Sequence, residues 1–208
     1  MLRSFSAILV ALLLFVGAAS AQRADVTLTL NEAFFDAVLD SVFQNFDAPS
    51  FPIKAEKTSG CDESITLLRE LNGVRTAVRF RDGKVFVPLA FKGQYSAPLI
   101  GCMDIAGTAD TNIDLEFDRQ GQRLLGRAHV QSVNLNGTGG VGGSLIAKIL
   151  QGEIDKKFNT IEIAKLENLA FTFPVARTGN LRLRPVAMRP EIAGGQLNIV
   201  VTYEFLKG

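Results

Sequence analysis

A glycine-rich stretch at residues 136–143, N-G-T-G-G-V-G-G, has the residue types of a phosphate-binding loop. Gly137, Gly139 and Gly142 match the G-x-G-x-x-G spacing of dinucleotide-binding proteins. Such a loop joins a parallel strand to a helix inside a βαβ unit, whereas hairpin patterns lie on both sides of this stretch. The second kind of phosphate loop needs a lysine at the position that Gly143 occupies. We therefore interpret the glycines as a sharp turn into a helix and expect no bound nucleotide.

Few other side chains have a spacing that supports catalysis or metal binding. His129 is the only histidine, and no motif places a hydroxyl, thiol or carboxylate partner beside it, which favours a surface or half-buried strand position. The alternating polar residues 110–116 could form a cation site, but strand alternation already explains them as a solvated face. The sequence contains no G-x-S-x-G, H-E-x-x-H or calcium-loop motif. We expect a protein that is not an enzyme and that uses neither a metal nor a cofactor.

Cys61 and Cys102 are the only cysteines. In an exported chain an even number of cysteines suggests a disulfide, and a loop of this size would stabilise the fold by about 4 kcal/mol in the chain-entropy description. A metal site would need more ligands at closer spacing. We predict a Cys61–Cys102 disulfide.

Residues 1–21 have the features of a secretory signal peptide. Arg3 precedes the apolar run A-I-L-V-A-L-L-L-F-V-G-A-A, and the small residues 19–21 offer a cleavage site. A retained membrane anchor is the alternative, but the run is shorter than the roughly 20 apolar residues that a spanning helix needs. We expect cleavage near Ala21 and one exported domain at residues 22–208, in a periplasm or secreted.

The charges argue against nucleic acid as a partner. The chain has 22 Lys and Arg against 21 Asp and Glu, and no long run of either sign, whereas tight nucleic-acid binding usually needs a basic face. Arg182, Arg184 and Arg189 cluster in one predicted strand and could meet anionic headgroups. The alternative is that they lie on an ordinary solvated strand face.

Two segments have the apolar spacing of amphipathic helices. Asn31 is placed to cap a helix over residues 32–46, with Asp36, Asp40, Gln44 and Asn45 opposite its apolar face. That apolar face consists of Phe34, Phe35, Val38, Leu39, Val42, Phe43 and Phe46. A second helix is expected from about Ser144 to Phe158, with a stripe formed by Ile146, Ile149, Leu150, Ile154 and Phe158.

The remaining segments alternate with the period of strands. Residues 61–135 read as hairpins, and residues 166–175, 181–190 and 195–205 read as three more strands, with Leu197, Ile199, Val201, Tyr203 and Phe205 on one face of the last. Turns are expected at residues 81–83, 119–121, 178–180 and 194–195. The predicted class is α+β: a strongly bent antiparallel sheet wrapped around the long second helix, with the first amphipathic helix closing one opening near the mature N-terminus.

This order of elements resembles the tubular lipid-binding (BPI-like) superfamily, in a single-barrel bacterial form. The resemblance is carried by V-T-L-T-L-N-E-A-F-F-D-A-V-L-D-S-V-F, by the passage from V-N-L-N-G-T-G-G to D-K-K-F-N, and by I-E-I-A-K-L-E-N-L-A-F. It covers nearly all of the mature chain, but as a pattern of elements. Many members have two barrels or a lipid anchor, whereas this chain has one predicted barrel and no anchoring cysteine.

The resemblance implies a non-catalytic envelope protein that binds or carries a lipid or other hydrophobic molecule, with transient membrane contact. The residues expected to line its tunnel are Phe34, Phe35, Val38, Leu39, Val42, Phe43, Leu115, Phe117, Ile146, Ile149, Leu150, Ile154, Phe171 and Phe173. For each of them the alternative is an ordinary core position. Two other functions stay open: a structural or protein-interaction module with a filled core, and an enzyme in which His129 would be the first residue to test.

Overall fold

We describe the fold from a computed structural model of the chain, which covers residues 22–52, 61–97, 101–136, 144, 148–149, 151–152, 160–177 and 179–208. The predicted signal peptide, the glycine-rich turn and most of the predicted second helix, including Ile146, Leu150 and Ile154, lie outside these described residues.

The described part of the chain consists mostly of strands. They are β1 (Arg23–Asn31), β2 (Ser50–Pro52), β3 (Ser64–Leu68), β4 (Glu70–Leu71), β5 (Val74–Arg75), β6 (Arg79–Arg81), β7 (Lys84–Ala97), β8 (Gly101–Asp118), β9 (Arg123–Leu135), β10 (Ile161–Lys165), β11 (Phe171–Val175), β12 (Gly179–Ala193) and β13 (Gln196–Lys207). The α-helix α2 (Glu32–Asn45) directly follows β1, and the short 3-10 helix η1 (Leu166–Leu169) joins β10 to β11.

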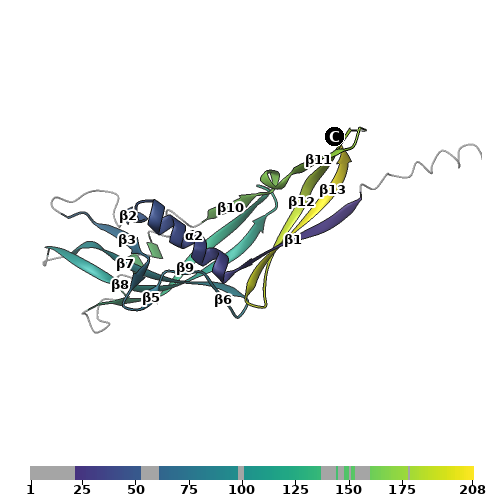
Figure 1. Cartoon of the computed structure of the whole chain (residues 1–208). Coiled ribbons are helices and arrows are strands. Elements are labelled where there is room, and N and C mark those ends of the chain that lie inside the picture. The colour runs from purple at the N-terminus through teal and green to yellow at the C-terminus, as the bar shows by residue number, and fades with distance from the viewer. Residues whose placement is uncertain are drawn as a thin grey trace, which may run out of the picture.

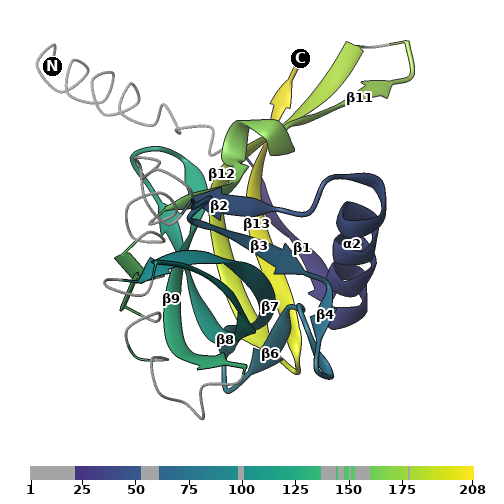
Figure 2. The same cartoon turned by 90° about the vertical axis from the view of Figure 1, so that its left-hand side faces the viewer.

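The strands form two curled antiparallel sheets. One has four strands in the order β1-β13-β12-β11, and the other has seven, in the order β10-β9-β8-β7-β3-β2 with β6 also paired to β7. The four-stranded sheet projects from the body in Figure 1, and the view along the molecule in Figure 2 shows the two sheets curling around a common interior, with α2 alongside. The predicted hairpin turns 81–83, 119–121 and 194–195 lie between paired strands and are confirmed.

The core lies between the inner faces of the two sheets. On β13 the predicted alternation is confirmed, since Leu197, Ile199, Val201 and Tyr203 are buried. They pack in one cluster with Leu124 of β9 and with buried residues of β7, β12 and η1. Full burial of one such aliphatic side chain stabilises the fold by about 2 kcal/mol, so these rows hold the sheets together.

The predicted sheet wrapped around a long helix is wrong. The two sheets pack directly on each other, with Leu124, Met188 and Leu166 in one buried cluster between them. In the described residues the fold is therefore mostly β, with α2 beside the sheets and not inside them. Alternation in a sequence identifies the buried face of a strand, but it does not reveal whether a helix or another sheet covers that face.

The predicted disulfide is confirmed. Cys61 and Cys102 are bonded, with their Cα atoms 5.4 Å apart, and the bond joins the residues before β3 to the start of β8. This covalent link fixes one end of the seven-stranded sheet. No helix among the described residues has the length and apolar character needed to cross a membrane.

Candidate functional site

Helix α2 starts where the sequence predicts. The side chain of Asn31 accepts a hydrogen bond of 2.9 Å from the backbone N–H of Phe34, which satisfies one of the free donors of the first turn. Because Asn31 is also the last residue of β1, strand and helix are joined without a loop. The position of α2 is therefore tied to the edge of the four-stranded sheet.

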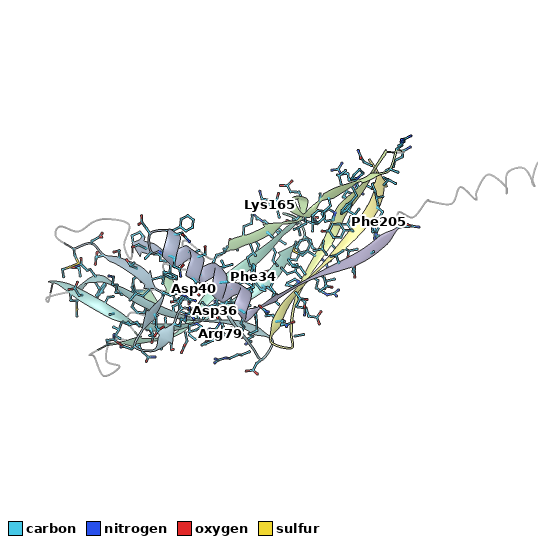
Figure 3. The ribbon with its side chains drawn as sticks, in the orientation of Figure 1. Phe34, Asp36, Asp40, Arg79, Lys165 and Phe205 are labelled. Carbon is cyan, nitrogen blue, oxygen red and sulfur yellow. A yellow bond between two sulfur atoms is a disulfide. The ribbon has the colours of Figure 1, made fainter. Side chains whose placement is uncertain are left out.

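A row of carboxylates holds α2 to the protein. Glu32, Asp36 and Asp40 recur every four residues and so lie on one side of the helix. Asp36 lies 3.1 Å from the guanidinium of Arg79 (Figure 3). Glu32 accepts a hydrogen bond of 2.9 Å from the backbone N–H of Phe80. The charged side of α2 thus faces the segment from β3 to β6.

Asp40 has the densest set of these contacts. Its carboxylate lies 2.6 Å from the Nε atom of Arg69 and 2.7 Å from a guanidinium nitrogen of Arg75. The hydrogen bonds from Arg69 and then Arg75 lower the pKa of Asp40 below its ordinary value. Arg69 also donates to the backbone carbonyl of Thr76, so its side chain joins α2 to the β4–β5 region on two sides.

This attachment divides the apolar face that the sequence predicts for α2. Phe35, Leu39, Val42 and Phe43 are half-buried, and the ring of Phe35 contacts that of Phe80 at a centroid distance of 5.7 Å. In contrast Phe34, Val38 and Phe46 are exposed, at 48%, 44% and 70%. Asp36 and Asp40, which the sequence places opposite the apolar face, bind arginines that lie far away in the sequence.

The inner face of the four-stranded sheet is covered at its centre and open at its edges. Val26 and Leu28 of β1 lie opposite the buried Val201 and Ile199 of β13, and yet they remain 53% and 52% exposed. At the other edge the exposed apolar side chains of β11 are Phe171, Phe173 and Val175. Figure 1 shows β1 and β11 as the two borders of this sheet.

Strand β10, which enters η1 and then β11, adds Ile161 and Ile163, also exposed. We call the set formed by Val26, Leu28, Phe34, Val38, Ile161, Ile163, Phe171, Phe173 and Val175 the edge apolar residues. They belong to two continuous stretches of chain, residues 26–38 and 161–175. Each stretch carries an edge strand of the four-stranded sheet.

The predicted tunnel residues that the structure describes lie in different environments, and Leu39, Val42 and Phe43 are the half-buried residues of α2 named above. Phe34, Val38, Phe171 and Phe173 are exposed edge apolar residues. Phe35, Leu115 and Phe117 pack against the core between the sheets, while Ile149 packs against a second core under β3, β7 and β8. Leu115 and Phe117 also line an open groove of about 670 Å³ between β8 and β12, whose other lining residues include Arg119 and Arg189.

Sequence reasoning missed Val26, Leu28, Ile161, Ile163 and Val175. The signal for β1 is visible in V-T-L-T-L, where every second residue is apolar. What the sequence does not show is that β1 and β11 lie at sheet edges, where each strand has a neighbouring strand on one side only.

Other ion pairs join neighbouring strands. His129 Nε2 lies 3.4 Å from a carboxylate oxygen of Asp114, and both side chains are substantially exposed. On the outer face of the four-stranded sheet Glu204 lies 2.5 Å from both Arg184 and Arg23. The hydrogen bond from Arg184, followed by that from Arg23, lowers the pKa of Glu204. These pairs join neighbouring strands and do not form a catalytic arrangement.

Comparison with known proteins finds no match for this chain, either among protein-family models or among curated proteins. We therefore infer its function from its own side chains.

Proposed function

We propose that this protein binds or carries a hydrophobic, lipid-type molecule and performs no catalysis. The observation that supports this proposal most strongly is the exposure of the edge apolar residues, of which those on β1 and β11 lie along the two borders of the four-stranded sheet. Exposed apolar side chains that occur singly need no explanation, whereas rows of them on soluble proteins mark binding surfaces.

The attachment of α2 adds to this argument. A helix with this sequence would bury the most apolar area by turning Phe34 and Val38 inward. Its carboxylates instead bind arginines, and Phe34 and Val38 of its apolar face stay at the surface, as do Val26 and Leu28 of the adjoining strand. A hydrophobic ligand bound on this surface would remove these exposed apolar side chains from water, which is favourable by about 25 cal/mol per Å² of apolar area buried.

We further propose that the protein acts outside the cytoplasm. Disulfides such as Cys61–Cys102 form and persist in oxidising compartments, and residues 1–21 have the pattern of a signal peptide. A lipid-type cargo in the cell envelope is also what the resemblance to the tubular lipid-binding superfamily implies.

Lipid mass spectrometry tests this function. The protein should be exported, purified without detergent, and compared with an unrelated exported control. We expect one class of lipid at a near-stoichiometric amount. A clean spectrum, repeated after incubation with envelope lipids, would contradict the proposal.

Variants locate the ligand. Leu28→Ser together with Phe34→Ser should remove most of the bound lipid, while Thr27→Ser, on the opposite face of β1, should leave it unchanged. Leu28, Phe34 and Thr27 are all exposed, so the melting temperature of either variant should differ little from that of the wild type.

A structural or protein-interaction module is the second candidate, and β1 favours it. This edge strand is exposed along almost its whole length, and a free strand edge is a template for pairing with another chain. That function predicts no co-purifying lipid and a partner whose binding is abolished by a proline at Thr27. A lipid in the purified protein would exclude a solely structural role.

A further inference from the structure

The hairpin β11–β12 and the end of β13 meet at the projecting end of the four-stranded sheet. Phe173 lies opposite Leu181, which in turn lies opposite Lys207, so residues from three strands form one row across this end. We call residues 171–184 and 205–208 the distal end. It is the part of the sheet farthest from the seven-stranded body in Figure 1.

Positive charge is concentrated at the distal end. The chain has no acidic residue between Glu167 and Glu191, although four arginines lie there. The nearest carboxylate on β13 is that of Glu204, which is already bound by Arg184 and Arg23. Arg177, Arg182 and Lys207 are exposed, and within the described residues they form no ion pair. The protein as a whole has a net charge of only +1, so this excess is local.

Apolar side chains lie at the same end of the sheet, on the same face as Lys207 and on the face opposite to Arg182. Phe171 and Phe173 are each 50% exposed, and Val175 directly precedes the turn that contains Arg177. Arginine and lysine beside exposed aromatic and aliphatic side chains are the composition of surfaces that enter the headgroup region of a membrane, where the rings reach the acyl boundary and the cations bind the lipid phosphates.

We propose that the distal end is a docking surface for an anionic lipid bilayer. Charge complementarity selects an anionic partner, and the apolar side chains select one with an apolar interior. The docking surface shares Phe171, Phe173 and Val175 with the edge apolar residues of the proposed function, but it does not include Leu28 and Phe34. Docking to added vesicles does not require a bound cargo.

Vesicle co-sedimentation tests the proposal. The purified protein should bind vesicles of phosphatidylcholine mixed with phosphatidylglycerol, bind pure phosphatidylcholine weakly, and lose affinity as salt increases. Each cation near an anionic surface contributes a factor of about five, so Arg177→Glu with Arg182→Glu should lower partitioning by about thirtyfold or more. The matched control is Lys84→Glu with Lys92→Glu, which makes the same change of net charge on exposed positions of β7.

The apolar contribution has its own variant. Phe173→Ser should weaken binding to the anionic vesicles at high salt, where the charges are screened, with an unchanged melting temperature because the side chain is half-exposed. The proposal is overturned if the wild type does not bind anionic vesicles, or if the arginine pair and the lysine pair reduce binding equally. Absence of lipid from the purified protein would contradict the cargo proposal alone, because docking is measured on added vesicles.

Discussion

Strand β13 and helix α2 have equally clear amphipathic patterns in the sequence, but only β13 buries its apolar side chains fully in the structure. β13 buries Leu197, Ile199, Val201 and Tyr203, as its alternation predicts. α2 buries no residue, and its acidic side faces the protein. A central strand is hydrogen-bonded on both sides and cannot rotate, whereas a helix attached along one side can turn until its charges find partners. Amphipathic patterns are therefore more reliable for central strands than for helices at the edge of a fold.

The largest effect is expected on β13. Leu197→Ala removes buried methyl groups from the core between the sheets and should lower the free energy of unfolding by about 3 kcal/mol. Denaturant melts of the wild type and variant measure this change. A loss below about 1 kcal/mol would mean that the two sheets do not pack as tightly as the structure shows.

A smaller and more local effect is expected from the arginines under α2. Arg69→Met removes the contacts to Asp40, Asp36 and the carbonyl of Thr76, so the amides of α2 should exchange faster while global stability falls less than for Leu197→Ala. Hydrogen exchange followed by mass spectrometry resolves the two regions. Arg75→Met, at a more exposed arginine that binds Asp40 alone, is the matched control and should loosen α2 less.

Lowering the pH should affect α2 more than β13. The folded-state pKa of Asp40 is lowered, so its contribution is present above its ordinary value of 3.8 and is lost as the pH falls through the folded value. Exchange in α2, measured relative to β13 in the same sample, should therefore increase below about pH 4. Asp40→Asn should remove this acid dependence from α2. An equally steep dependence in that variant would show that another group is responsible.

The smallest effect on stability is expected at the exposed face of α2. Val38→Ser should change the free energy of unfolding by no more than about 0.5 kcal/mol, because the side chain is already 44% exposed. The same exchange should weaken binding of a fluorescent fatty acid if α2 contributes to the ligand surface. A large loss of stability would instead show that Val38 is covered.

Local features of this fold could be predicted, and features that depend on distant segments could not. Asn31 as a helix cap, the turn at Gly194 and the buried face of β13 follow from a few neighbouring residues. The attraction between Asp40 and Arg69 does not, because nothing near either residue specifies the other. The long wrapped helix was predicted wrongly for the same reason: the inner faces of both sheets were visible as alternation, but not the fact that they cover each other.

In the candidate site, too, local features could be predicted and features that depend on distant segments could not. Its apolar residues could be recognised in part, as Phe34, Val38, Phe171 and Phe173 were. Their exposure could not, since it depends on which strands lie at the edges of a sheet. That order is set by the pairing of β1 with β13, two segments at opposite ends of the sequence.

The pairing of β1 with β13 also has a consequence for how the chain folds. Arg23 pairs with Glu204 and Asn31 with Gln196, so β1 is synthesised long before β13 and cannot form its backbone hydrogen bonds to that strand until β13 has been made. Contacts of such high sequence separation form slowly, because most of the loop-closure entropy is lost before they contribute. During synthesis or translocation β1 and α2 would expose apolar surface without a partner, which is the condition under which chaperones bind. Removal of residues 196–207 would delete the strand between β1 and β12, and would leave β1 with no sheet to join.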